Sequence, residues 1–275
     1  MELPTKRREV QQYNPKLMVL FGKPKTGKST LMASLDDNLI IDLEDGYKSL
    51  SVMSVLALSA ETLFEIKTAL KEKAAKEGKK PYRFITIDNA TRLEELALKY
   101  AAHLYRTTTP MGTNWGMLKD PKNPTMNLKD KNGKNIPDPK ADVRLLPNGS
   151  GYLYLRKAVK EFVDMFKPYC ETLILIAHVK DKQIQKNGEE MNEMSVDLAG
   201  KLGDIICGEA DAIGYIYRSG KDTIVTFENG DNTIREARPL HLRGKKFVVA
   251  TSDADNNVTV DMSKIFISTE TNNNQ

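Results

Sequence analysis

Cysteine is scarce in this chain, and its scarcity narrows the class of protein. The 275 residues include only Cys170 and Cys207, which are far apart and form no CxxC pair. The sequence therefore predicts neither a disulfide framework nor a cysteine zinc site, and a reducing, cytoplasmic compartment fits it best. Histidine is equally sparse: His103, His178 and His241 are widely separated and have no companion ligand at metal-binding spacing. A transition-metal site is therefore not expected.

Long apolar runs and a strong charge excess are also missing. No stretch reaches the roughly 20 apolar residues that a membrane-spanning helix needs, and the basic residues 1–15 lack the apolar core of a secretory signal. We expect a soluble protein with no membrane partner, a flexible basic N-terminus over 1–15 and a disordered tail over 269–275. The 41 Lys and Arg residues against 37 Asp and Glu residues leave a net charge of +4, which permits nucleic-acid binding without requiring it.

What the sequence does contain is a phosphate-binding loop between a strand and a helix. The apolar run LMVLF at 17–21 breaks into the full Walker A pattern GKPKTGKS, and the helical segment LMASL follows. The two glycines let backbone N–H groups turn inward around phosphates, and the helix N-terminus adds its positive dipole end. The expected nucleotide-binding residues are Gly22, Lys23, Pro24, Lys25, Thr26, Gly27, Lys28, Ser29 and Thr30. We expect ATP as the ligand, with Lys28 reaching its β and γ phosphates and Ser29 binding Mg²⁺.

Strand and helix patterns alternate along the chain, which favours an α/β fold with a mostly parallel central sheet flanked by helices. Buried strands are predicted at 38–43, 82–88 and 171–178. Amphipathic helices are predicted at 61–77, 91–105, 152–167 and 198–206. Later apolar segments between glycine and asparagine turns predict C-terminal antiparallel strands that extend the sheet, at 212–217, 222–227 and 246–250. We interpret residues 16–268 as one domain.

Residues 107–150 interrupt this alternation. They are rich in proline, glycine, asparagine and lysine, and they hold the only tryptophan, Trp115. A loop of this length in a compact domain is either functional or disordered, so we interpret it as a surface insertion. Trp115, with Tyr105, Arg106 and the lysines of the insertion, could supply the stacking and charge that single-stranded nucleic acid requires. An ordinary polar loop is the alternative.

Two strand ends supply carboxylates for the metal and for the attacking water. Asp88 ends the strand YRFITID and matches a Walker B aspartate, which holds Mg²⁺ through water. The next residue is Asn89, where many ATPases of the additional-strand class carry a glutamate, so the base must lie elsewhere. Glu44, at the end of IIDLEDG, is the candidate, because a carboxylate there can lie within one water of the γ phosphate. The alternative is that Asp42, Glu44 and Asp45 are solvated turn residues.

Together these segments resemble the RecA-like ATPase family, in which a glutamate ends the strand after the Walker A helix in an I-D-x-E setting. The chain is also similar to phage-type AAA proteins of RecA-like fold, including single-strand annealing ATPases. The segments that carry the resemblance lie between about 17 and 217 and are GKPKTGKST, IIDLEDG, FITIDNAT, LILIAHVKD and EADAIGYIYR. The resemblance implies a RecA-like P-loop NTPase fold, ATP hydrolysis and assembly into a ring or filament of identical subunits. For a phage-encoded chain it implies the host cytoplasm.

The resemblance also implies residues that couple the nucleotide to DNA. His178 would occupy the strand-end sensor position, where RecA relatives place a polar side chain that responds to the γ phosphate. A histidine that merely lies at the mouth of the sheet is the alternative. The polar segment 180–193 would be the counterpart of a DNA-binding loop, with phosphate contacts from Lys180, Lys182 and Lys186. The same segment contains Glu189, Glu190 and Glu193. A plain solvated loop therefore stays open.

A looser positional resemblance concerns the neighbouring subunit. Arg243, Lys245 or Lys246 would complete the ATP site of that neighbour, as arginine fingers do, whereas lysines that protect a hairpin edge are the alternative. The resulting prediction is a Mg-dependent ATPase, stimulated by DNA, that acts on single-stranded DNA in phage recombination, annealing or replication. Its proposed catalytic residues are Lys28, Glu44 and His178. A small-molecule P-loop phosphotransferase and a non-hydrolytic nucleotide-dependent assembly protein stay open as other classes.

Overall fold

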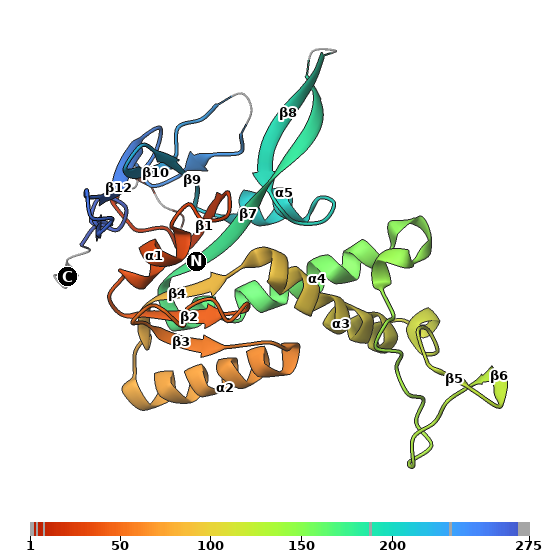
Figure 1. Cartoon of the computed structure of the whole chain (residues 1–275). Helices are drawn as coiled ribbons and strands as arrows, with labels where there is room; N and C mark the ends of the chain where they lie inside the picture. Colours follow the sequence, from red (N-terminus) through yellow and green to blue (C-terminus); the bar gives the residue numbers. More distant parts are fainter. Residues whose placement is uncertain (1–2, 4, 8, 187–188, 231–232, 269–275) are drawn as a thin grey trace.

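The structure is a computed structural model that describes residues 3, 5–7, 9–186, 189–230 and 233–268, and a large twisted sheet forms its centre (Figure 1). One half of the sheet is parallel. Its strands are β1 (Leu17–Gly22), β2 (Asn38–Asp42), β3 (Met53–Leu56), β4 (Tyr82–Asp88), β7 (Cys170–Lys186) and β9 (Ala212–Ser219). The order across this half is β9-β1-β7-β4-β2-β3, so β7 lies between β1 and β4. The register aligns Gly22 with His178 and Asp42 with Asp88, which brings their carboxyl ends to one edge.

The other half of the sheet is antiparallel and continues from β9. It consists of β10 (Asp222–Thr226), β12 (Lys246–Ser252) and β13 (Val258–Val260), with β11 (Glu236–Ala237) paired to β9. The expected C-terminal antiparallel extension is therefore present, but the prediction was wrong for its first strand. Strand β9 runs parallel to β1 and turns antiparallel only toward β10. The helix that precedes it carries the chain back across the sheet, which a strand pattern alone does not reveal.

Helices cover both faces of the sheet. They are α1 (Lys28–Ala33), α2 (Ala60–Glu77), α3 (Ala90–Thr108), α4 (Gly151–Asp164) and α5 (Leu202–Glu209), with short 3-10 turns η1 (Pro110–Gly112), η2 (Val143–Leu145), η3 (Pro147–Gly149) and η4 (Lys167–Tyr169). Alternate residues of β1 point to opposite faces. Val19 and Phe21 pack with α2, α3, α4 and α5, while Met18 and Leu20 pack with α1 and the C-terminal segment around Ile265. These two cores bury the sheet on both sides, as a parallel sheet requires.

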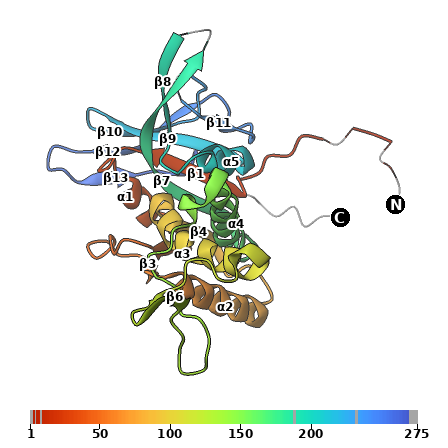
Figure 2. The ribbon, with the colours of Figure 1, turned by 90° about the vertical axis from the view of Figure 1, so that its right-hand side faces the viewer.

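The polar segment after His178 is strand rather than loop. Strand β7 continues beyond the central sheet to Lys186. This extension pairs antiparallel with β8 (Glu189–Val196). This β7–β8 ribbon projects from the body of the molecule (Figures 1 and 2). The expectation of a loop over 180–193 was therefore wrong for the described residues 180–186 and 189–193. Backbone pairing in a two-stranded ribbon does not require an apolar face, so the polar sequence of this segment carried no strand pattern.

The insertion after α3 is anchored at its base. It includes a small two-stranded sheet of β5 (Lys119–Asp120) and β6 (Asn123–Asn127) at one end of the molecule (Figure 1). Trp115 is partly buried and meets the ring of Tyr105 edge-on, with centroids 5.3 Å apart. Val143 is fully buried under α4. The tryptophan therefore packs against the domain, which leaves less of its ring for base stacking.

The two ends of the described domain are joined by one side chain. Asn14 Nδ2 donates to the Ile267 carbonyl at 2.7 Å, and the Ile267 N–H donates to Asn14 Oδ1 at 3.0 Å. The predicted tail over 269–275 lies outside the described residues. Among the residues that are described, no helix combines the length and the apolar content needed to cross a bilayer.

Candidate nucleotide-binding site

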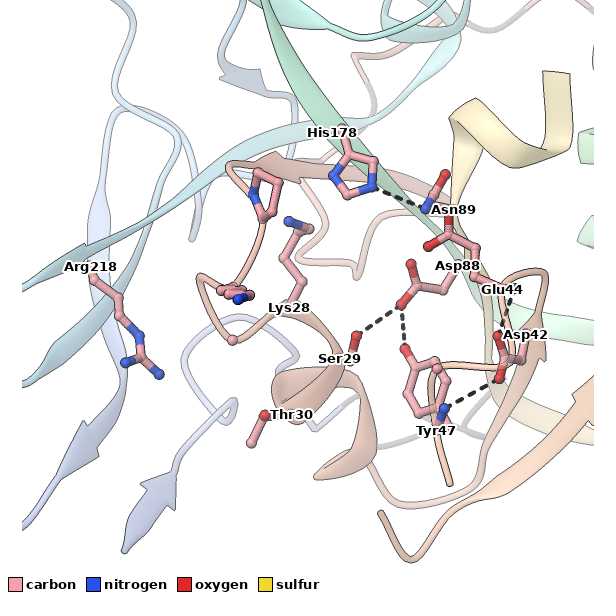
Figure 3. A pocket seen from close by; sticks show the side chains of 14 residues that line it. Lys28, Ser29, Thr30, Asp42, Glu44, Tyr47, Asp88, Asn89, His178 and Arg218 are labelled. Carbon is pink, nitrogen blue, oxygen red and sulfur yellow. Dashed lines mark hydrogen bonds between the residues drawn. The ribbon is translucent and has the colours of Figure 1, made fainter. Parts of the chain in front are cut away.

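A cavity of about 360 Å³ opens at the carboxyl edge of the parallel strands. Its lining brings together side chains that are far apart in the sequence, including Lys28, Ser29, Glu44, Asp88, His178 and Arg218 (Figure 3). Five of these were predicted as site residues, and Arg218 was not. Open α/β sheets bind ligands at this edge, because loops and helix N-termini converge there.

The loop between β1 and α1 forms one wall of the cavity. Gly27 has a left-handed backbone with φ 93°, and a Cβ on Gly22 would lie 2.4 Å from the Ile216 carbonyl oxygen on the neighbouring strand. Glycine is therefore favoured at both positions for different reasons: Gly27 adopts a φ that other residues rarely adopt, and Gly22 has no room for a side chain. Thr26 Oγ1 donates to the Lys23 carbonyl at 2.9 Å and closes the loop. The loop fits a phosphate group, since the two glycines let its backbone approach a ligand closely.

Lys28 lies folded over the loop. Its Nζ donates to the carbonyl oxygens of Gly22 at 3.0 Å and Lys23 at 2.7 Å, and only 7% of the residue is exposed. Burial lowers the pKa of this ammonium group, while the carboxylates of Asp88 and Glu44 raise it. A polyphosphate in the loop would supply the negative charge that a buried lysine lacks.

Asp88 lies across the cavity from the loop. Its Oδ2 accepts hydrogen bonds from Ser29 Oγ at 3.2 Å and from the Tyr47 hydroxyl at 2.6 Å (Figure 3). Burial raises the pKa of this carboxyl group; the two hydrogen bonds and Lys28 lower it, and the charge of Glu44 adds to the rise. A serine hydroxyl and a carboxylate this close are the hard oxygen donors that Mg²⁺ prefers. The donor set therefore fits the expected metal, and metal binding by these residues stays a prediction.

The turn after β2 separates the three acids that sequence reasoning treated together. Asp42 is buried, and its carboxylate accepts the backbone N–H groups of Glu44 at 3.0 Å and Tyr47 at 3.4 Å. Asp45 forms an ion pair with Lys48. Glu44 is exposed at the cavity. Asp42 thus holds the shape of the turn, and Asp45 is paired at the surface. Glu44 lines the cavity with Lys28 and Asp88, and its carboxylate has no hydrogen-bond or ion-pair partner among the residues that the structure describes. Its role as a base stays a prediction.

His178 contacts the start of α3. Its Nε2 lies 3.2 Å from Asn89 Nδ2, and Asn89 Oδ1 accepts the N–H of Arg92 as the N-cap of the helix. An amide nitrogen only donates, so His178 Nε2 accepts and the neutral ring carries its hydrogen on Nδ1. In the part of the chain that is described, this buried Nδ1 has no hydrogen-bond partner. The ring therefore has an unused donor at the mouth of the cavity.

Two residues at the cavity were missed by sequence reasoning. Tyr47 follows the acidic turn, and Arg218 ends the segment EADAIGYIYR, but neither belongs to a phosphate-binding pattern. Only the sheet order brings them to the loop. The aspartate-glycine-tyrosine turn after β2 is the one local signal that could have directed attention to Tyr47.

The other predicted positively charged residues lie away from this cavity. Arg243, Lys245 and Lys246 are exposed and do not line it. Arg243 instead donates to the carbonyl oxygens of Ala237 at 3.2 Å and Arg238 at 2.9 Å. Their action on a neighbouring subunit stays a prediction.

The β7–β8 ribbon carries the lysines expected to contact DNA. Lys180 Nζ donates to the Leu198 carbonyl and lies 3.8 Å from Asp197 Oδ1, so it supports the base of the ribbon. The backbone register places Lys182 opposite Glu193 and Lys186 opposite Glu189. The side chains of Lys182, Lys186, Glu189 and Glu190 lie outside the described residues. In the backbone register an acidic residue is thus the strand partner of Lys182 and of Lys186, and the DNA role of the ribbon stays a prediction.

The sheet order and the loop before α1 define a P-loop nucleotide-binding protein with an α/β RecA-like fold, in which a mostly parallel sheet continues into C-terminal antiparallel strands. The family model described as "AAA domain" matches residues 14–259, so the chain belongs to this family.

Two solved structures are similar in outline. A RadB recombinase structure is 11% identical, with 90% of this chain and 91% of that chain covered and a TM-score of 0.43. A prototypical ATPase from the type III secretion system of pathogenic bacteria is 14% identical, with 74% of this chain and 51% of that chain covered and a TM-score of 0.36. No curated protein matches this chain.

Proposed function

We propose that this protein is a Mg-dependent ATPase that acts on single-stranded DNA. The observation that carries the proposal is the 3.2 Å contact between Ser29 Oγ and Asp88 Oδ2, beside Lys28 in one cavity. Two residues from the start of α1 and one from the end of β4 thus converge where a triphosphate and its metal need them. Chance convergence of this kind is rare, because each residue type matches its expected task.

Each residue has a distinct part in the proposed reaction. Lys28 would leave its loop carbonyls and bind the β and γ phosphates, and Ser29 and Asp88 would hold Mg²⁺. When bound, Mg²⁺ neutralises charge that develops on the transferred phosphoryl group. Glu44 orients the attacking water, since it is the exposed carboxylate at the metal end of the cavity.

The proposed link to DNA passes through His178. This residue lies at the level of Gly22, where β7 leaves the sheet and continues into the β7–β8 ribbon. Its unused Nδ1 donor can respond to the presence or loss of the γ phosphate, and the strand is continuous from there to Lys186. We propose that the ribbon contacts single-stranded DNA, that identical subunits assemble into a ring or filament, and that the process served is phage recombination, annealing or replication.

An ATPase assay without DNA and with single- or double-stranded DNA tests the proposal. We expect Mg-dependent phosphate release, faster with single strands. Lys28→Ala should abolish it, Glu44→Gln should lower it by at least about a hundredfold, and Glu65→Gln on the exposed face of α2 should leave it unchanged. Hydrolysis by Glu44→Gln at the wild-type rate would contradict the choice of base.

The same assay separates the other two classes. Phosphate release without any acceptor argues against a small-molecule phosphotransferase. Tight ATP binding without turnover under every DNA condition would favour a non-hydrolytic assembly protein, for which the amide of Asn89 after Asp88 is the motivating feature.

A further inference from the structure

The β9–β10 hairpin covers the outer side of the phosphate loop. Arg218 of β9 stands opposite Thr223 of β10 in the antiparallel register. A Cβ on Gly27 would lie 3.8 Å from Thr223 Oγ1 and 3.9 Å from Arg218 Nη2, which is ordinary contact distance. The absence of a side chain at Gly27 therefore leaves this pair directly beside the loop backbone.

Arg218 is available to a ligand. It is exposed and lines the same cavity as Lys28 and Ser29. Within the described ranges, no carboxylate lies at ion-pair distance from its guanidinium group. The guanidinium group of Arg243, the arginine predicted to act on a neighbouring subunit, instead donates to two backbone carbonyls. Arg218 is thus a cation of the same subunit whose guanidinium group has no partner among the residues that the structure describes.

Its position decides which part of a nucleotide it can reach. Figure 3 shows Arg218 on one side of the loop, whereas Asp88 and Glu44 lie on the other side, beyond Lys28. In a loop of this type the backbone N–H groups cradle the α and β phosphates, and the lysine and metal ligands hold the β and γ phosphates. The Asp88 side is therefore the γ-phosphate end, and Arg218 faces the opposite end.

We infer that Arg218 binds the α phosphate of the nucleotide from within the same subunit. The inference rests on the proposed function, because it takes a Mg·nucleotide as the ligand of the loop. A planar guanidinium group with several donors suits a phosphate oxygen pair better than an ammonium group does. ATP and ADP both carry an α phosphate, so Arg218 contributes to binding and not to cleavage of the γ phosphate.

Calorimetry with Mg·ATP and with Mg·ADP tests this assignment in the full chain. We expect Arg218→Ala to raise both Kd values by the same factor, about tenfold, which corresponds to about 1.4 kcal/mol. Arg218→Lys should restore part of the affinity. Lys221→Ala, which removes an exposed cation from the same hairpin outside the cavity, is the matched control and should bind like wild type. The melting temperature of nucleotide-free Arg218→Ala should equal that of wild type.

Two outcomes would overturn the assignment of Arg218 to the α phosphate. Unchanged ADP affinity with a lower kcat would place Arg218 at the γ phosphate and overturn the inference, as would wild-type affinity of Arg218→Ala for both nucleotides. If wild-type protein itself gave no heat with either nucleotide, the proposed function would fail and the inference with it.

Discussion

The hydroxyl of Tyr47 donates a 2.6 Å hydrogen bond to Asp88 Oδ2, the same oxygen that accepts the Ser29 hydroxyl. Tyr47 is only 4% exposed, and burial and the charge of Asp88 raise the pKa of its hydroxyl, so it stays a donor. Asp88 is therefore held by one side chain from the phosphate-loop helix and one from the acidic turn. This contact ties the turn that carries Glu44 to the expected metal ligand.

Removal of that hydroxyl should weaken both the fold and the metal site. Tyr47→Phe keeps the ring and leaves the buried Asp88 carboxylate with one hydroxyl donor fewer, so we expect a loss of about 1–2 kcal/mol in the free energy of unfolding. We also expect a weaker Mg-dependence of ATP binding. Urea unfolding of the nucleotide-free protein and calorimetry at several Mg²⁺ concentrations measure the two effects. Tyr13→Phe, at an exposed tyrosine outside the cavity, is the control, and equal behaviour of the two variants would contradict this role.

The contribution of the α3 N-cap to stability can be measured separately from that of the contact between Asn89 and His178. Asn89→Ala removes the oxygen that accepts the Arg92 N–H and should lower the free energy of unfolding by about 1–2 kcal/mol. Asn89→Ser keeps a capping oxygen but cannot supply the amide donor to His178, so its loss should stay within about 0.5 kcal/mol. Urea unfolding compares the two variants. Equal losses would show that the bond to His178, rather than the cap, stabilises this junction.

The close approach of β1 and β9 makes Gly22 irreplaceable for packing as well as for phosphate binding. Gly22→Ala places a Cβ 2.4 Å from the Ile216 carbonyl oxygen, so we expect the strands to shift at a cost of about 1–3 kcal/mol. Gly208→Ala is the matched substitution in α5, where a Cβ meets nothing within 4 Å, and it should stabilise by about 0.5–1 kcal/mol. Thermal unfolding of the nucleotide-free proteins distinguishes them. A neutral Gly22→Ala would mean that the strands can separate freely.

Glu94 should give the protein a pH-dependent stability. The residue is 7% exposed, and its carboxylate accepts the Ala199 N–H at 2.7 Å. Burial raises the pKa of this carboxyl group despite that bond and the charge of Arg144. A folded-state pKa above the unfolded value means that stability is greatest with Glu94 protonated, and is lost as the pH rises through the folded pKa.

Glu94→Gln keeps an acceptor for the Ala199 N–H but cannot ionise. The variant should therefore gain stability relative to wild type as the pH rises from about 4 to about 8. Urea unfolding across that range measures the difference. A difference that stayed constant with pH would show that Glu94 has no raised pKa in the folded protein.

Local patterns predicted much of the fold, and the particular elements show why. The phosphate loop, the strand that ends at Asp88 and the helix after Ser59 are each specified by neighbours in the chain. The predicted helix at 61–77 lies within α2, whose N-cap is the side chain of Ser59 and whose C-terminus is the left-handed Gly78. Such signals involve residues a few positions apart, so they can be recognised in the sequence without knowledge of the rest of the molecule.

Elements that depend on a distant partner were missed or misjudged. Strand β3 is an exposed edge with Met53 49% exposed, so its residues show no buried face. The β7–β8 ribbon is stabilised by its own backbone pairing and carries polar residues on both strands. Trp115 of the insertion packs edge-on against Tyr105, a contact that composition could not indicate.

The sequence by itself determined the phosphate loop, the strand that delivers Asp88 and the acidic turn with Glu44, because backbone geometry and short-range hydrogen bonds set these features. Tertiary structure alone decided that β7 separates β1 from β4, that Tyr47 reaches Asp88, and that Arg218 lies beside Gly27. Strand order follows from how whole helices cover the two faces of the sheet. Contacts across that order depend on the packing of the entire chain.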